Sequence, residues 1–185
     1  PGLAEANIKV IQAGYDYGHN THSTAQNVYR IETKEKKVGR YMDITGNKAT
    51  AYGMIAAAEK AGLKLYLGSY PITPATDVLH ELSKHKSLGV TTVQCEDEIA
   101  GCASAVGASF AGALACTSTS GPGICLKSEA MNLAVIMELP LVVLDVQRGG
   151  PATGLPTKSE QTDLLQCLFG RNGESPMPVI AATSP

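Results

Sequence analysis

From residue 46 onward, short apolar runs alternate with longer segments whose apolar residues recur at helical spacing. The runs are rich in aliphatic and β-branched residues, which predicts buried strands. The predicted strands cover residues 65–67, 90–94, 114–117, 140–146 and 178–182. The segments between them predict helices over residues 49–60, 73–86, 99–111, 124–139 and 159–169. Strands that alternate with single helices predict an α/β fold built on a parallel sheet.

The link between the first strand and the next helix is stiff and carries a hydroxyl group. Pro71 has no amide donor, so a central strand cannot continue through it. Thr73 is a good N-cap and Pro74 suits the first helical position, which predicts that a helix begins here. The Thr73 hydroxyl would then face the carboxyl end of the strand, where open α/β sheets bind their ligands.

The run at residues 140–146 gives the clearest strand prediction. Because its apolar residues are nearly continuous, we expect it to be buried on both faces, as in a parallel sheet. Asn47 is the predicted N-cap of the helix over 49–60, and Gly62 is its predicted stop. Residues 119–123 are predicted to form a turn.

The first 45 residues differ from the rest of the chain. They are polar and predict an irregular extension, either a linker or the tail of a preceding domain, whereas residues 46–185 predict one domain. The chain starts at Pro1 and stops just after an apparent strand, so we expect a fragment of a longer subunit. His19 and His22 have no acidic or cysteine partner nearby, which favours a solvated loop over a metal site.

Composition excludes several classes of function. A hydrophobic content of 44% and a net charge of −2 indicate a globular protein without the basic surface that nucleic acid requires. The uncharged stretch 99–126 consists mostly of small residues and is interrupted by turn residues, so no membrane span is predicted. The five cysteines contain no C-x-x-C pair, which argues against zinc or iron–sulfur ligands and favours buried free thiols in a reducing cytoplasm.

Glu98 is the first candidate for chemistry. It lies in the predicted first turn of a helix built from small, uncharged residues, where a partly desolvated carboxylate can hydrogen-bond a ring nitrogen. The alternative is that Glu96, Asp97 and Glu98 only cap the helix, since negative charge is favourable at a helix N-terminus.

Arg148 is the second candidate, at the end of the strand predicted at 140–146. Glycines follow it and would let a ligand approach the backbone, while the guanidinium could bind a carboxylate through two hydrogen bonds. The alternative is a structural salt bridge to Asp145 or Glu160.

Residues Ser120, Gly121, Pro122 and Gly123 form the third candidate. They resemble a phosphate-binding loop only loosely, because neither glycine-rich nucleotide motif is present. A loop that allows close approach of the backbone is favoured. Ser118 and Ser120 have no nearby His and Asp, so a hydrolase triad is not predicted.

Several motifs in sequence order together resemble one family. They are residues 69–74 (SYPITP), 96–100 (EDEIA), 119–123 (TSGPG), 145–151 (DVQRGGP) and 154–161 (GLPTKSEQ). They resemble the α subunit of 2-oxoacid:ferredoxin (acceptor) oxidoreductases, and most closely those acting on 2-oxoglutarate. The resemblance covers about residues 46–185 and implies a three-layer, pyrimidine-binding domain of a thiamine diphosphate enzyme. Residues 1–45 would then be the linker or tail of a preceding γ-type domain, which some α subunits carry at their N-terminus.

The resemblance also implies roles for individual residues. Glu98 would hydrogen-bond the aminopyrimidine ring of thiamine diphosphate and favour its imino tautomer. Thr73 and Arg148 would hold the carboxylate and keto group of the substrate, and Thr157 would help with its distal end. The loop from Ser120 to Gly123 would pack near the pyrimidine.

The implied activity is oxidative decarboxylation of 2-oxoglutarate to succinyl-CoA, with coenzyme A as cosubstrate and ferredoxin as electron acceptor. A diphosphate-binding G-D-G…N motif and iron–sulfur cysteines are missing from this chain. The resemblance places the diphosphate site, Mg²⁺ and the iron–sulfur cluster on a β subunit or another polypeptide. The alternatives are a pyruvate or branched-chain 2-oxoacid enzyme, or a non-catalytic domain that binds a small acid.

Overall fold

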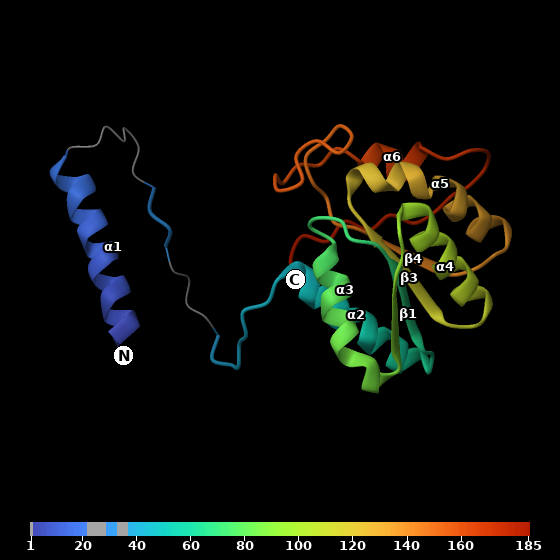
Figure 1. The fold of residues 1–185 in the computed structure, drawn as a ribbon, viewed down its shortest axis with the longest axis horizontal. Coiled ribbons are helices and arrows are strands. Elements are labelled where there is room, and N and C mark those ends of the chain that lie inside the picture. The colour runs from blue at the N-terminus through green and yellow to red at the C-terminus, as the bar shows by residue number, and fades with distance from the viewer. Residues whose placement is uncertain (1, 22–28, 33–36) are drawn as a thin grey trace. The chain divides into compact units, whose positions relative to one another are not determined.

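The computed structural model describes residues 2–21, 29–32 and 37–185, which divide into two units, Pro1–Tyr41 and Met42–Pro185 (Figure 1). The first unit contains helix α1 (Gly2–Asn20), none of whose residues is buried. The prediction of an irregular extension was therefore wrong for this segment, whose good helix formers lie in residues 3–13. His19 belongs to the helix, while His22 lies outside the described residues.

The second unit is built on a parallel sheet of four strands, in the order β2-β1-β3-β4. Leu65 is paired with Val90 on one side and with Leu114 on the other, and Ala115 is paired with Leu141. The predicted parallel α/β fold is confirmed. The strands are β1 (Leu65–Ser69), β2 (Val90–Gln94), β3 (Leu114–Thr119) and β4 (Leu141–Asp145).

Helices cover both faces of this sheet and make a three-layer arrangement (Figure 1). On one face, α2 and α3 pack with β1 and β2 around a core that includes Leu67 and Leu82. On the other face, α4 and α5 form a second core that includes Cys102 and Met131. The helices are α2 (Gly46–Ala61), α3 (Thr76–Leu82), η1 (Ser83–Leu88, a 3₁₀ helix), α4 (Glu98–Phe110), α5 (Gly121–Ile136) and α6 (Leu164–Phe169).

Two of the predicted helix caps were wrong. Thr45, not Asn47, is the N-cap of α2 and accepts a hydrogen bond from the Lys48 amide, although the predicted stop at Gly62 is confirmed. Helix α3 does not begin at Thr73. The Thr76 hydroxyl instead bonds both the amide and the carbonyl of Ile72, so residues 73–75 form a separate turn before the helix.

The C-terminal part differs most from the predictions. Strand β4 lies at the edge of the sheet and is only half-buried, because its outer side has no strand neighbour among the described residues. Residues 178–182 form no strand, and the helix predicted over 159–169 is reduced to α6. The loop before α6 is held by its own main-chain bonds, among them Gly149 N–H to the Lys158 carbonyl at 2.7 Å.

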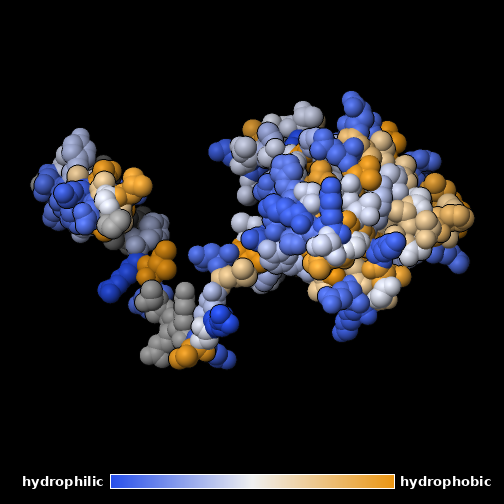
Figure 2. Space-filling model, turned by 60° about the horizontal axis from the view of Figure 1, so that its bottom comes forward, coloured by the Kyte–Doolittle hydropathy of each residue, from blue (hydrophilic) through white to orange (hydrophobic). Residues whose placement is uncertain are grey.

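The cysteines of the second unit differ in how far they are buried. Cys102 and Cys116 are buried as expected. Cys95 and Cys167 are only half-buried, and Cys125 is exposed on α5, which corrects the expectation for these three thiols. Within the described ranges, we find no helix long and apolar enough to cross a membrane. Hydrophobic patches lie among hydrophilic ones on the face of the second unit drawn in Figure 2. Over the second unit as a whole, the exposed apolar side chains include Phe110 of α4, Ile136 of α5, and Leu165 and Phe169 of α6.

Candidate functional site

The order of the strands identifies one position in the sheet as a switch point. After β1 the chain crosses through α3 to β2, and after β3 it crosses through α5 to β4 on the opposite side. The carboxyl ends of β1 and β3 are therefore neighbours whose connections lead apart. In open α/β sheets, the crevice at such a position is where ligands bind.

Buried hydroxyl groups join these two strand ends. Ser69 Oγ lies 2.6 Å from Ser118 Oγ, and Tyr70 Oη lies 2.8 Å from Thr119 Oγ1. All four residues are buried. Because the phenol is desolvated, the pKa of Tyr70 is raised well above its ordinary value. The nearby carboxylate of Glu98 adds to this rise in pKa.

Glu98 is the first residue of α4 and is half-buried. The capping role belongs to Asp97, whose carboxylate accepts a hydrogen bond from the Ala100 amide at 2.9 Å. The neighbouring Glu96 is exposed. Among the residues that the structure describes, no cation pairs with the Glu98 carboxylate within 4.0 Å. A carboxylate placed in this way remains available to a hydrogen-bonding ligand.

The segment from Ser120 to Gly123 begins helix α5, so the predicted turn at 119–123 is largely its first turn. Gly123 lies against Glu98: an added Cβ would overlap the hydroxyls of Thr119 and Tyr70 and would lie 3.1 Å from Cγ of Glu98. The backbone at Gly123 thus packs closely against these side chains, while the approach of a ligand to this loop stays a prediction. The neighbouring Ser120 is fully buried, and its hydroxyl has no hydrogen-bond partner within the described part of the chain.

Arg148 and Thr73 meet directly. Arg148 is 6% exposed and donates hydrogen bonds to the main-chain carbonyls of Thr73, at 2.8 Å, and Thr153, at 3.2 Å. Over the described ranges it forms no salt bridge with Asp145 or Glu160, so that alternative is not observed. The Arg148 guanidinium lowers the pKa of Tyr70, in opposition to the effects of burial and of Glu98.

Thr157 lies in the loop that follows Arg148 and is exposed. The loop folds back so that the Gly149 amide donates to the carbonyl of Lys158, the residue after Thr157. In the described structure, no hydrogen bond joins Thr157 to Thr73 or to Arg148. Its predicted contact with the distal end of a substrate therefore stays a prediction.

Sequence reasoning missed several residues of this site. Lys127 of α5 is fully buried, and its ammonium donates to the Glu98 carbonyl and to Thr117 Oγ1. Asp163 is 3% exposed and accepts a hydrogen bond from Gln147 at 2.6 Å. Burial and the neighbouring Asp163 raise the pKa of Asp145 to about 8. No local pattern marks these residues, because charged side chains ordinarily indicate a solvated surface.

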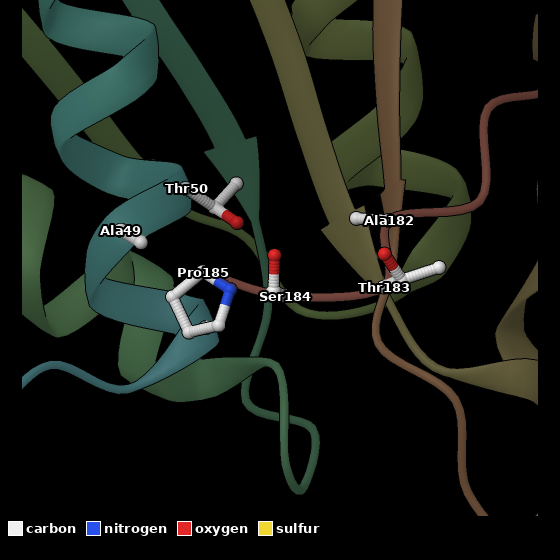
Figure 3. A pocket seen from close by; sticks show the side chains of 7 residues that line it. Ala49, Thr50, Ala182, Thr183, Ser184 and Pro185 are labelled. Carbon is white, nitrogen blue, oxygen red and sulfur yellow. The ribbon is translucent and has the colours of Figure 1, made fainter. Parts of the chain in front are cut away.

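One surface cavity lies away from these residues, and its lining has few groups that could take part in a reaction. It has a volume of about 490 Å³ and lies between α2 and the last residues of the chain (Figure 3). None of its lining side chains is ionisable, and it includes neither Glu98, Thr73 nor Arg148. The described residues also contain no group of three or more His, Cys, Asp or Glu side chains that could hold a metal ion.

Comparisons with known proteins agree with this architecture. Residues 56–185 match the family described as pyruvate flavodoxin/ferredoxin oxidoreductase, thiamine diphosphate-binding. The chain is 58% identical over its full length to the 2-oxoglutarate oxidoreductase subunit KorA of Mycobacterium tuberculosis, of which it covers 28%. It is 42% identical to the 2-oxoglutarate synthase subunit KorA of Archaeoglobus fulgidus, over 76% of this chain and 40% of that protein.

A solved structure agrees as well. It is 2-oxoglutarate:ferredoxin oxidoreductase from Magnetococcus marinus with 2-oxoglutarate, coenzyme A and succinyl-CoA bound. The TM-score is 0.64 at 47% identity, over 72% of this chain and 23% of that one. The chain thus spans well under half the length of these relatives. By its match over most of its length, the chain belongs to the thiamine diphosphate-binding family of pyruvate flavodoxin/ferredoxin oxidoreductases.

Proposed function

We propose that this chain is the pyrimidine-binding part of the α subunit of a 2-oxoglutarate:ferredoxin oxidoreductase. The whole enzyme would convert 2-oxoglutarate and coenzyme A to succinyl-CoA and carbon dioxide, and pass electrons to ferredoxin. The observation that carries the proposal is the half-buried carboxylate of Glu98 beside the β1–β3 switch point, which has no cationic partner within 4.0 Å among the described residues. The similarity to subunits named for 2-oxoglutarate supports the choice of oxoacid.

The residues at the switch point fit an aminopyrimidine ring. Glu98 offers a carboxylate to a ring nitrogen, and Gly123 brings the start of α5 against it without a side chain. The buried hydroxyl of Ser120, which lacks a partner in the described structure, is a further polar group in the segment that we expect to pack near the ring. When bound, thiamine diphosphate supplies the nucleophilic carbon and the electron sink for decarboxylation of a 2-oxoacid.

This chain would also hold the oxoacid. Arg148 uses part of its guanidinium on main-chain carbonyls, and its remaining N–H groups can bind a carboxylate. These bonds fix the plane of the guanidinium beside Thr73, whose exposed side chain could reach the same ligand. Thr157, on the exposed part of the loop, would contact the distal carboxylate of 2-oxoglutarate.

The site would be completed by other polypeptides. We assign the diphosphate, Mg²⁺ and the iron–sulfur cluster to a β subunit or another partner, as the family resemblance implies. Exposed apolar side chains on α4, α5 and α6 are consistent with burial against such a partner. We also place the enzyme in the cytoplasm, where free cysteines stay reduced.

The experiment uses the full-length protein with its partner subunits. We expect Glu98→Gln to lower ferredoxin-linked turnover by at least about 100-fold, as for loss of a group that moves a proton. Glu96→Gln, on the exposed neighbour, is the matched control and keeps normal turnover. Near-normal turnover of the Glu98 variant would favour a non-catalytic domain that binds a small acid.

A second experiment identifies which 2-oxoacid is the substrate. Turnover of the wild-type complex is measured with 2-oxoglutarate, pyruvate and a branched-chain 2-oxoacid. We expect 2-oxoglutarate to have the highest kcat/KM. If it is instead the poorest substrate, the chain belongs to an enzyme for one of the other oxoacids.

A further inference from the structure

Lys127 is the largest side chain in the second unit that is fully buried. It lies on α5, one helical turn after Gly123, so both residues share the helix face toward Glu98 and Tyr70. Burying an ammonium group is unfavourable unless it is hydrogen-bonded. Desolvation accordingly lowers the pKa of Lys127. Packing alone therefore does not explain why a buried lysine is found at this position.

The contacts of the Lys127 ammonium group suggest a role for this residue. The ammonium donates to the main-chain carbonyl of Glu98 at 3.1 Å and to Thr117 Oγ1 at 2.9 Å. It also lies 5.0 Å from the centre of the Tyr70 ring, within range for a cation–π interaction. A single side chain therefore joins the first turn of α4, the middle of β3 and the residue that follows β1.

The charges around Lys127 favour the ammonium form without neutralising it directly. The carboxylates of Glu98 and Asp97, and the thiols of Cys102 and Cys95, all act to raise its pKa against the effect of burial. In the described structure, none of those carboxylates lies within the 4.0 Å of a salt bridge with it. The Glu98 carboxylate thus stays free of Lys127, although the two residues are joined through the main chain.

We propose that Lys127 is a positioning residue for Glu98: it holds the first turn of α4 through the Glu98 carbonyl and so orients the carboxylate toward the site. The inference rests on the proposed contact between Glu98 and thiamine diphosphate. The side chain of Lys127 would not touch the cofactor or the substrate. Its effect on both would pass through Glu98.

The test replaces Lys127 with Met in the full-length complex, which keeps an unbranched side chain one atom shorter and removes the charge and the donors. We expect hydrogen exchange to become at least tenfold faster at the first turn of α4. We expect thiamine diphosphate, titrated into the cofactor-free complex, to bind at least tenfold more weakly. The KM for 2-oxoglutarate stays within about twofold while kcat falls. Lys60→Met, at an exposed lysine of α2, is the control and changes none of these.

A double-mutant cycle separates positioning from a general structural role. If Lys127 acts through Glu98, adding Lys127→Met to Glu98→Gln weakens thiamine diphosphate binding less than twofold further. If the double variant instead loses thiamine diphosphate affinity by the product of the two single losses, the inference is overturned. Unchanged hydrogen exchange in Lys127→Met would also overturn it. If Glu98→Gln alone leaves cofactor affinity and turnover unchanged, the proposed function fails instead, whatever hydrogen exchange reports about Lys127.

A milder variant covers the case in which Lys127→Met does not assemble. Thr117→Val removes one partner of the ammonium and keeps the shape of the buried residue. We expect it to speed exchange at the first turn of α4 and to weaken thiamine diphosphate binding at least threefold. If both measurements match the wild type, Lys127 does not position Glu98.

Discussion

Arg148 donates a hydrogen bond of 2.8 Å to the main-chain carbonyl of Thr73, a residue 75 positions earlier in the chain. The bond joins the loop after β4 to the loop after β1, across the intervening end of β3. Two residues that the sequence suggested separately for the same ligand are thereby held side by side. The guanidinium is almost fully buried, so its orientation is well defined.

This relationship predicts the effect of Arg148→Lys. Lysine keeps the charge but loses the planar group that can serve both carbonyls and a carboxylate at once. We expect the KM for 2-oxoglutarate to rise at least about tenfold, with a smaller change in kcat, in steady-state assays of the complex. Arg171→Lys is the matched control, since Arg171 also bonds main-chain carbonyls but lies outside the site. An unchanged KM for Arg148→Lys would argue against substrate binding by this residue.

Gly123→Ala tests the close approach beside Glu98. The added methyl group overlaps the hydroxyls of Tyr70 and Thr119, so the start of α5 must shift. We expect a loss of about 1–3 kcal/mol in the free energy of unfolding, as for overpacking, together with weaker thiamine diphosphate binding.

The control for that substitution is Gly107→Ala on the exposed side of α4, where an added Cβ meets nothing within 4 Å. There alanine is expected to stabilise the helix by about 0.5–1 kcal/mol. Thermal or denaturant unfolding measures both variants. Equal effects of the two substitutions would contradict the tight contact at Gly123.

The raised pKa of Asp145 predicts that the stability of the folded protein depends on pH. The pKa of this side chain is raised to about 8 in the folded protein from an ordinary value of 3.8. Between these values the folded state binds more protons than the unfolded state, so stability falls as pH rises from about 4 to about 8. We expect Asp145→Asn to flatten this fall in melting temperature. Asp77→Asn, at an exposed residue of α3, should leave it unchanged. Identical slopes in wild type and Asp145→Asn would refute the prediction.

Leu67→Ala probes the core beneath the site. Leu67 is completely buried in the middle of β1 and belongs to the core shared with α2 and α3. We expect its removal to cost about 2–5 kcal/mol in the free energy of unfolding, because a cavity remains. Leu63→Ala, at a leucine that is 45% exposed, should cost much less. Chemical denaturation compares the two, and a cost below about 1 kcal/mol for Leu67 would contradict the core assignment.

Much of the architecture was predictable because it depends on local patterns. The apolar runs located all four strands, and their alternation with helices implied parallel pairing, since a parallel connection needs a crossover. Parallel strands end at the same edge of a sheet, so the motifs at residues 69–74, 96–100 and 119–123 were expected to meet. Glu98, Gly123 and Arg148 were proposed as site residues from their positions after strands.

Other features depend on which segments become neighbours, and the pattern of apolar residues does not record this. It predicted a buried strand at 140–146, yet β4 lies at the sheet edge because no further strand pairs with it among the described residues. It also suggested Thr73 as a cap, whereas the Thr76 hydroxyl makes the local bonds.

The sequence alone therefore determined the fold class, the order of the four strands along the chain and the edge of the sheet at which we propose the site. Only the tertiary structure decided that Lys127 is buried beneath Tyr70 and that Asp145 faces Asp163. The physical reason is that the cost of burying a charged group depends on hydrogen-bond partners from distant segments. Those partners come together only when the chain has folded.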